Sequence, residues 1–238
     1  MQNKDNTVYG GFSGEPKYED AMKNYNTMII HESLVDFKLY KNFKVVDFGA
    51  GIGSLSLIFR EKYKIEPICI EIDEINKKKL SEREFQHYDF LRNIKQKCNL
   101  IFSSNVLEHI EDDITVFKEM KDQLLPKGKI YLYLPARMIL WTQHDVNEGH
   151  YRRYEIKELK SKCANAGLKI ERLHYSDFLG FFALMLTKII GYNSQNGLGS
   201  YKSIKFYNKF IFPFSRLLDK IGFKYILGKN IILVAVKK

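Results

Sequence analysis

An α/β fold is expected for this chain, with a doubly wound, mostly parallel sheet of seven strands. From residue 44 onward, short runs rich in Val, Ile and Phe alternate with segments of helical periodicity. Such alternation favours right-handed crossovers and a parallel sheet that helices cover on both faces. A glycine-rich turn at 49–53 follows the first apolar run, at a place where such sheets bind ligands.

The first five strands and the helices between them follow from this alternation. The run KVVDF begins the sheet, and the apolar segment after the glycine turn has helical spacing. Pro126 and Gly128 end a helix and open an alternating apolar strand. The expected strands are 44–48, 66–71, 86–88, 98–103 and 129–134, and the expected helices are 54–63, 74–82 and 112–124.

The last two strands lie in the C-terminal part of the chain. A helix over 155–166 ends at Gly167, and the stretch LKIERLHY after it has the pattern of a strand. The stretch NIILVAVKK at the C-terminus is the last strand, with Val234 and Val236 on one face.

The chain is organised as one domain with two additions. Residues 178–229 separate the last two strands and are rich in aromatic residues and lysine. Their length predicts a small lobe or a surface-docking insertion. We therefore expect an N-terminal helical cap over 1–40 and one domain over 41–238 that contains this insertion. The 238 residues suffice to bury a full core.

The composition predicts a cytoplasmic protein that is not integral to a membrane. The three cysteines, Cys69, Cys98 and Cys163, show no C-x-x-C spacing, so we expect neither disulfides nor a metal knuckle. The N-terminus lacks the basic and apolar regions of a signal peptide. The most apolar stretch, 178–192, is too short to span a bilayer and contains Lys188.

Positive charge is concentrated in the last third of the chain. Residues 1–150 hold 21 Lys and Arg and 23 Asp and Glu, a net charge of −2, whereas residues 151–238 hold 17 and 5, a net charge of +12. This bias favours an anionic partner, such as a phosphorylated substrate, nucleic acid or the acidic inner face of a membrane. General solubility charge is the alternative reading.

The glycine turn in KVVDFGAGIGSLSLIF narrows the choice of ligand. A dinucleotide fingerprint would require a glycine at Ser54 or Ser56, and a P-loop would require a lysine after Gly53. Asp47 precedes the first glycine by two residues, where a carboxylate repels a pyrophosphate and suits a cationic or amine-bearing ligand. A turn whose glycines only ease packing is the alternative.

A strand that ends in an acid followed by G-x-G-x-G resembles motif I of the class I S-adenosylmethionine-dependent methyltransferases. The segment GHYRRY further resembles a bacterial branch of small-molecule and glycan-pathway enzymes. The resemblance covers 40–175 well and the last strand loosely. It implies S-adenosyl-L-methionine as cofactor, S-adenosyl-L-homocysteine as product, and a last strand that inserts antiparallel between its predecessor and the sheet. In the turn, the implied cofactor-binding residues are Asp47, Gly49, Ala50, Gly51 and Gly53.

Three further stretches fit the same cofactor. The second strand ends at Glu71, where a carboxylate accepts hydrogen bonds from both ribose hydroxyls, whereas Asp73 better suits a helix N-cap. An acid and an aromatic ring after the third strand suit the adenine, and a polar residue ends the fourth strand beside the methionine part. The expected residues are Glu71, Ile72, Asp89, Phe90 and Asn105.

The segment WTQHDVNEGHYRRYE, residues 141–155, is the expected wall of the acceptor site. It follows the fifth strand and combines polar donors with titratable groups. His144 is the expected catalytic base, oriented by Asp145 or Glu148. His109 is either a second catalytic base or only hydrogen-bonded at a helix start. The expected substrate-binding residues are His150, Tyr151, Arg152, Arg153 and Tyr154.

Two alternatives stay open for this segment. Arg152 and Arg153 suit a bidentate clamp on a phosphate or carboxylate, or they pair with neighbouring acids such as Glu155 while the tyrosines pack the next helix. No dense cluster of Asp, Glu and His is visible in the sequence, so no metal is expected.

The sequence therefore predicts an enzyme that methylates an oxygen of a small-molecule or glycan-linked acceptor. Both neutral and anionic acceptors are compatible with this prediction. The fourth strand lacks the Asn/Asp-Pro-Pro-aromatic run of nucleic-acid amino methyltransferases, and no Pro-Cys nucleophile is present. An RNA methyltransferase or RNA-binding module that uses the basic last third is the second hypothesis. A non-catalytic protein that docks on membranes through 178–229 is the third.

Overall fold

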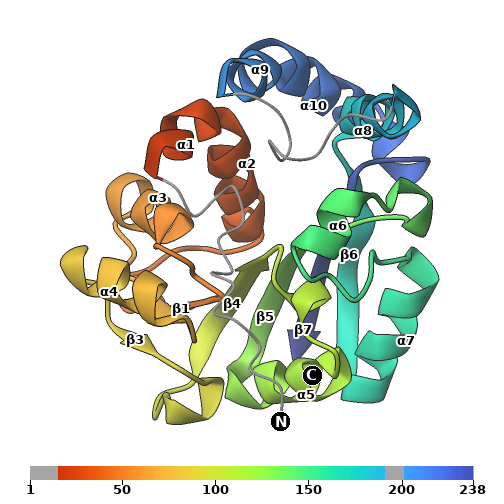
Figure 1. The fold of residues 1–238 in the computed structure, drawn as a ribbon. Helices are drawn as coiled ribbons and strands as arrows, with labels where there is room; N and C mark the ends of the chain where they lie inside the picture. Colours follow the sequence, from red (N-terminus) through yellow and green to blue (C-terminus); the bar gives the residue numbers. More distant parts are fainter. Residues whose placement is uncertain (1–15, 191–200, 238) are drawn as a thin grey trace, which may run out of the picture.

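The protein is built on one seven-stranded sheet, described here from a computed structural model that covers 16–190 and 201–237 (Figure 1). The strand order is β3-β2-β1-β4-β5-β7-β6. Strands β1 to β5 are parallel, and β7 pairs antiparallel with both β5 and β6, which confirms the predicted insertion of the last strand. The strands are β1 Val45–Phe48, β2 Ile68–Ile70, β3 His87–Tyr88, β4 Cys98–Ser104, β5 Leu124–Pro135, β6 Leu168–Ser176 and β7 Asn230–Lys237.

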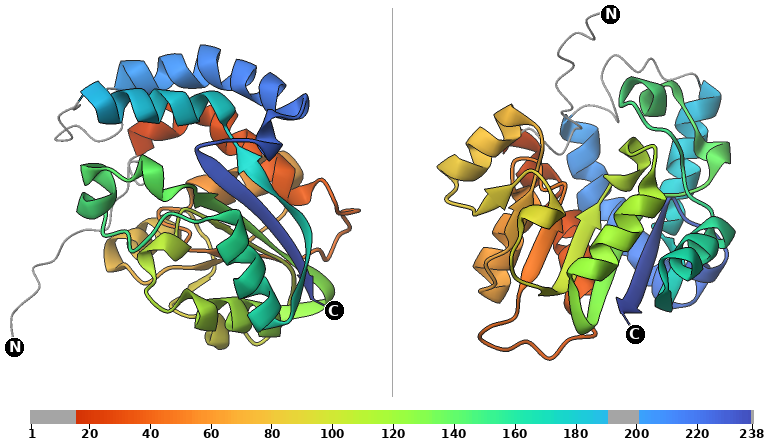
Figure 2. Two further views of the ribbon diagram at one scale, coloured as in Figure 1. Left: turned by 90° about the vertical axis from the view of Figure 1, so that its right-hand side faces the viewer. Right: turned by 90° about the horizontal axis from the view of Figure 1, so that it is seen from below.

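Helices cover both faces of the sheet (Figures 1 and 2). Helices α2, α3 and α10 bury their apolar side chains on one face, and α5 and α7 bury theirs on the other. The α-helices are α1 Pro16–Ala21, α2 Lys23–Leu34, α3 Ser54–Tyr63, α4 Glu74–Glu82, α5 Asp113–Gln123, α6 Gln143–Asn147, α7 Ile156–Ala166, α8 Phe178–Ile190, α9 Tyr201–Phe206 and α10 Phe212–Lys220.

Strand β5 shows how the sequence pattern fills two cores. Its side chains alternate between the two faces, so Ile130, Leu132 and Leu134 join the α5–α7 side while Tyr131 and Tyr133 join the α2–α3–α10 side. Because both faces are covered, residues 130–135 are apolar or aromatic instead of alternating with charged residues. All five of these side chains are fully buried.

Strands β5 and β2 differ most from expectation, and the other predicted bounds differ by a residue or so. Strand β5 begins at Leu124, which pairs with Cys98 ahead of a register shift, whereas the sequence predicted a start at 129. Pro126 and Gly128 therefore lie inside the irregular beginning of the strand. Strand β2 spans only Ile68–Ile70 rather than 66–71.

The N-terminal helices and the C-terminal insertion lie side by side, although they are distant in sequence (Figure 1). Helix α2 buries Tyr25 and Ile29 in the same core as Phe212 of α10. Parts of the expected cap, 1–15, and of the insertion, 191–200, lie outside the described residues, and the predicted division at residue 40 stays a prediction.

A buried carboxylate attaches the insertion to the sheet. Asp177 follows β6, and its Oδ1 accepts hydrogen bonds from the hydroxyls of Tyr207 (2.6 Å) and Ser215 (2.9 Å). Its Oδ2 lies 3.2 Å from the ammonium group of Lys229, just before β7. Within the part of the chain that the structure describes, no helix is long and apolar enough to cross a membrane.

Candidate functional site

The glycine turn between β1 and α3 has the conformation that its sequence predicted. Gly49, Gly51 and Gly53 have φ angles of +74°, +55° and +82°, a region that side chains other than glycine rarely adopt. A Cβ at Gly49 would lie 2.3 Å from a methyl group of Val106, whereas a Cβ at Gly51 would meet no atom within 4 Å. The backbone at Gly51 is therefore open to a ligand.

Asp47 lies buried beneath this turn. The hydroxyl of Ser56 donates a hydrogen bond of 2.6 Å to its Oδ2. Burial raises the pKa of Asp47 to about 7, against the lowering effect of the Ser56 hydrogen bond and with a smaller raising effect from the charge of Glu71. Near neutral pH this carboxyl group changes charge, so a cation nearby would favour its ionised form.

Glu71 connects the turn to the end of β2. Its Oε2 accepts a hydrogen bond from the Gly51 amide (2.7 Å), and its Oε1 accepts from the amides of Ile72 (2.8 Å) and Asp73 (2.9 Å). Since a carboxylate oxygen has two lone pairs, Oε2 can accept one more hydrogen bond. Asp73 caps α4 through the amide of Asn76 at 2.9 Å, which confirms the N-cap expected for it.

The remaining predicted cofactor residues follow the ends of neighbouring parallel strands. Ile72 is 70% exposed and Phe90 43%, which is high for such side chains, and Asp89 pairs with Lys77 at 2.8 Å. Asn105 follows β4, is exposed and has a φ of +53°. Its backbone N–H donates a hydrogen bond to the Tyr133 carbonyl (2.8 Å). Because β1 to β4 are parallel, these residues share one edge of the sheet with the glycine turn.

Asp145 is the centre of the acceptor segment. Its carboxylate is fully buried and lies 2.9 Å from Nδ1 of His150 and 2.8 Å from the Arg153 guanidinium. Burial by itself would raise the pKa of Asp145, but the hydrogen bond from His150 and the charge of Arg153 lower it to about 2. The backbone amide of Thr142 adds a further hydrogen bond of 2.8 Å. Asp145 thus holds this segment together.

A second buried acid, Asp113 at the start of α5, holds the end of the same segment. It lies 2.8 Å from the Arg152 guanidinium and 2.6 Å from the Lys162 ammonium group, and it accepts a 2.7 Å hydrogen bond from the Tyr154 hydroxyl. Both arginines therefore pair with acids of the fold, as the alternative reading allowed, although the partners are Asp113 and Asp145 rather than Glu155. A substrate contact for Arg152, Arg153 or Tyr154 stays a prediction.

Two predicted site residues of the segment, Tyr151 and His144, have no contact with Asp113 or Asp145 shorter than 4 Å in an ion pair or hydrogen bond, and His144 is partly buried. Tyr151 is 53% exposed. Nδ1 of His144 lies 3.8 Å from Glu148 Oε1, and burial lowers its pKa, so the imidazole is neutral at pH 7 and able to accept a proton. Glu148 is thus the acid beside His144, since Asp145 points to His150. The catalytic roles of His144 and His109 stay predictions.

Glu108 is a site residue that the sequence reasoning passed over. It follows β4 and is fully buried, and burial raises its pKa to about 8. The next residue, His109, has its ring edge-on to that of His150, with centroids 4.5 Å apart. Burial and the neighbouring charge of His150 lower the pKa of His109 to about 4. The pattern Leu-Glu-His drew attention to the histidine alone, because burial of the glutamate depends on distant segments.

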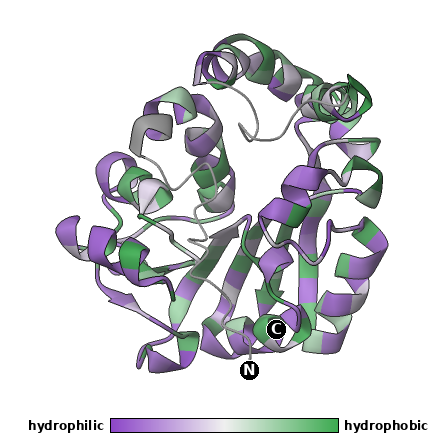
Figure 3. Cartoon of the chain, in the orientation of Figure 1, coloured by the Kyte–Doolittle hydropathy of each residue, from purple (hydrophilic) through white to green (hydrophobic). Residues whose placement is uncertain are grey.

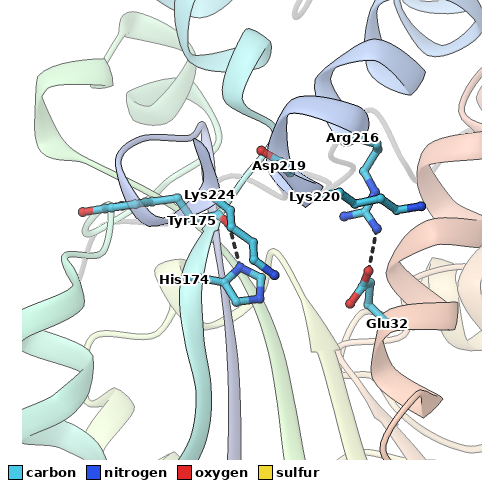
Figure 4. Close-up of a pocket in the computed structure, with 7 residues that line it drawn as sticks. All are labelled: Glu32, His174, Tyr175, Arg216, Asp219, Lys220 and Lys224. Atoms are coloured by element: carbon cyan, nitrogen blue, oxygen red, sulfur yellow. Dashed lines mark hydrogen bonds and ion pairs between the residues drawn. The ribbon is translucent and has the colours of Figure 1, made fainter. Parts of the chain in front are cut away.

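A small polar pocket lies away from the glycine turn, where β6 meets α2 and α10. Its cavity volume is about 30 Å³, and Glu32 pairs with Arg216 inside it (Figure 4). Ligand sites for larger molecules usually exceed this volume. The other residues that line it are His174, Tyr175, Asp219, Lys220 and Lys224.

Comparison with protein families identifies one match. The model of a family described as "Methyltransferase domain" matches residues 19–173, which is more than half of the chain. The matched region includes the glycine turn, the ends of β2 to β4 and the whole acceptor segment. No match was found among curated protein sequences.

Solved structures with the same fold are distant in sequence. Phosphoethanolamine N-methyltransferase 2 of Haemonchus contortus, solved with S-adenosyl-L-methionine, has a TM-score of 0.59 and 14% identity over 99% of this chain and 61% of that one. Cyclopropane synthase MmaA2 of Mycobacterium tuberculosis has a TM-score of 0.58 and 12% identity, over 96% of this chain and 95% of that one. Geranyl diphosphate methyltransferase, solved with GPP and sinefungin, has a TM-score of 0.61 and 9% identity, over 91% of this chain and 78% of that one. These likenesses show the fold.

The turn geometry predicts unequal effects of alanine at two glycines. Gly49→Ala combines a left-handed φ with overlap at Val106, so we expect a loss of about 2–4 kcal/mol in the free energy of unfolding. Gly51→Ala has the φ cost alone, about 1–2 kcal/mol. Urea unfolding measures both, and Val106→Ala should recover part of the Gly49→Ala loss. Equal losses at the two glycines, with no recovery, would contradict the described packing.

Proposed function

The chain belongs to the methyltransferase-domain family, and from that membership we propose that it transfers a methyl group from S-adenosylmethionine to a small-molecule acceptor. The observation that carries the proposal is the turn at Gly49–Gly53, where open backbone at Gly51 stands beside the carboxylate of Glu71. Oε2 of Glu71 has one acceptor position left, and a charge-assisted hydrogen bond from a ribose hydroxyl suits it.

The surrounding side chains support each part of this cofactor. Ile72 and Phe90 offer exposed apolar surface to the adenine ring. Asp89, next to Phe90 in the chain, is the candidate acceptor of a hydrogen bond from the adenine amino group. Asn105 at the end of β4 borders the methionine part. Asp47 supplies buried negative charge beneath the turn, which favours the ammonium and sulfonium groups over a pyrophosphate.

The acceptor proposed is a hydroxyl group of a small or glycan-linked molecule. A hydroxyl needs a base, and the neutral imidazole of His144 is the candidate in the segment that follows β5. An anionic acceptor fits the basic C-terminal third, with its net charge of +12 over 151–238. Two structural neighbours, the phosphoethanolamine and geranyl diphosphate methyltransferases, carry phosphorylated compounds in their names.

A second proposal concerns the surface of the insertion, which we infer to dock on an anionic bilayer. We call the exposed side of α8, α9, α10 and their connections, 178–190 and 201–226, the lobe surface. Helix α8 lies beside α9 and α10 at one end of the molecule, and hydrophobic residues are frequent on it (Figures 2 and 3). Apolar side chains that are 50% to 74% exposed recur at helical spacing along α8 and along the continuous segment from α9 to the end of α10. In α8 they are Phe182, Leu186, Ile189 and Ile190, and in the other segment they are Phe206, Phe210, Phe214, Leu217 and Ile221.

The charges of the lobe surface favour lipid over a second copy of the chain. Its one acid, Asp219, is buried and accepts hydrogen bonds from the amides of Asp177 and Phe178. Two facing copies of this surface would bring like charges together, whereas anionic lipid headgroups neutralise these charges. The methylene stems of the lysines let their ammonium groups reach the headgroups while the exposed apolar side chains enter the bilayer. Of its basic residues, Lys205 pairs with Asp20 and Arg216 with Glu32. The others are Lys188, Lys202, Lys209, Lys220 and Lys224.

Calorimetry with S-adenosylhomocysteine tests the cofactor proposal. We expect binding by the wild type and at least about tenfold weaker binding by Glu71→Ala, because the ribose loses its charged acceptor. Glu74→Ala, a carboxylate 85% exposed on α4, is the matched control and should bind normally. Thermal unfolding verifies that the variants fold. A wild type that does not bind contradicts the cofactor, and full binding by Glu71→Ala contradicts the ribose contact alone.

The charge of Asp47 predicts a pH effect. Its pKa is about 7, so the carboxyl group is mostly neutral at pH 6 and mostly ionised at pH 8. S-adenosylmethionine carries one more positive charge than S-adenosylhomocysteine, so its relative affinity should rise about threefold or more over this range. Asp47→Asn should abolish this rise. Titration of the ligands themselves affects the wild type and the variant equally, so it cancels when the affinity ratios of the two proteins are compared. The same rise in the variant would exclude Asp47 as its source.

Vesicle sedimentation tests the lobe surface. We expect the wild type to bind vesicles that contain a quarter phosphatidylglycerol more strongly than neutral ones, with the difference lost in high salt. Phe210→Glu with Phe214→Glu should lower binding about tenfold or more. Val35→Glu, a change at an equally exposed residue directly after α2 and outside the lobe surface, should not. Binding unaffected by the double change, or a dimer in light scattering that the double change dissociates, would contradict docking on lipid.

A further inference from the structure

Three side chains after β4 and α6 converge at the acceptor edge of the sheet. Glu108 and His109 lie in the short turn Leu107–His109, directly after Asn105, and His150 follows α6. One carboxylate oxygen and one ring nitrogen from each histidine all lie within 4.8 Å of one another. Two imidazoles and a carboxylate at this spacing can bind the same ion.

The state of Glu108 is the first reason to look for an ion. Its side chain is fully buried, and neither carboxylate oxygen has a hydrogen-bond partner. Two buried acids nearby have partners. Asp113 contacts two cationic groups, and Asp145 contacts the Arg153 guanidinium and the His150 ring. Burying a polar group without a partner is costly, so proteins usually pair such groups or use them to coordinate a metal.

The orientation of His150 is the second reason. Its Nδ1 lies 2.9 Å from Asp145 Oδ1, and Asp145 is also bonded to Arg153 and to the Thr142 amide. An imidazole that donates through Nδ1 to a fixed carboxylate directs the lone pair of Nε2 away from it. This carboxylate–histidine arrangement is the usual support behind a metal-binding histidine. Arg153 does not neutralise Glu108 by a hydrogen bond, because its contacts go to Asp145.

We propose that Glu108, His109 and His150 bind a divalent transition-metal ion. Zinc is the best match to two imidazoles and one carboxylate, although iron(II) and manganese accept similar ligands. Three protein ligands leave one position open to water or to an oxygen of another molecule. An acceptor hydroxyl bound there would lose its proton more readily. Only this use of the metal rests on the proposed methyl transfer; binding of the ion does not.

Metal titration of the full chain tests the site. We expect the wild type, stripped of metal with a chelator, to take up about one zinc ion per chain in calorimetry. Cobalt(II) should give visible absorption bands of a low-coordinate site with nitrogen and oxygen ligands. Glu108→Gln and His150→Gln should each weaken zinc binding by at least about 100-fold, since each removes a direct ligand. His31→Gln, an exposed histidine paired with the Tyr63 hydroxyl, is the control and should bind normally.

The outcomes separate a metal site from a structural cluster. If the wild type takes up neither zinc nor cobalt, or if Glu108→Gln binds as well as the wild type, the proposal is wrong. Thermal unfolding of the metal-free proteins verifies that Glu108→Gln is folded, which we expect because the change removes an unpartnered acid. Calorimetry with S-adenosylhomocysteine on the same samples shows whether the cofactor site stands independently of the metal.

Discussion

The site depends on one backbone constraint, the left-handed conformation of three glycines between β1 and α3. At Gly49 the missing side chain lets Val106 from the end of β4 approach the turn, and at Gly51 it leaves the backbone bare. Glu71 then fixes the open amide of Gly51 from the neighbouring strand. The ends of β1, β2 and β4 are thereby joined in one rigid rim, to which the other predicted cofactor residues are attached.

Features decided by neighbours in the sequence could be predicted from it. The succession of strands and helices along the chain, the antiparallel last strand, the turn at 49–53 and the Asp73 cap each have a local signal or follow from the family pattern. The partners of the charged residues could not be predicted in the same way. Asp113 and Arg152 stand far apart in the chain, and only the packing of α5 against the acceptor segment brings them together. The same is true of Glu108 and His150, whose proximity no spacing rule contains.

The N-terminal helices and the C-terminal insertion form one structure around a shared core. Tyr25 of α2 packs against Phe212 of α10, with ring centroids 4.8 Å apart, and Arg216 pairs with Glu32. The insertion is also joined to the edge that carries the acceptor segment, because Lys188 of α8 donates a 2.7 Å hydrogen bond to the Ile139 carbonyl just after β5. The insertion therefore contacts the acceptor edge directly.

One turn of π-helix, Tyr207–Ile211, joins α9 to α10. Within it Asn208 points inward, and its side-chain oxygen accepts a 2.9 Å hydrogen bond from the Tyr25 amide in the first turn of α2, where Met22 provides no side-chain cap. The beginning of one helix is thus closed by a residue from almost the other end of the polypeptide. During synthesis this first-turn amide therefore meets its protein acceptor only after residue 208 has been made.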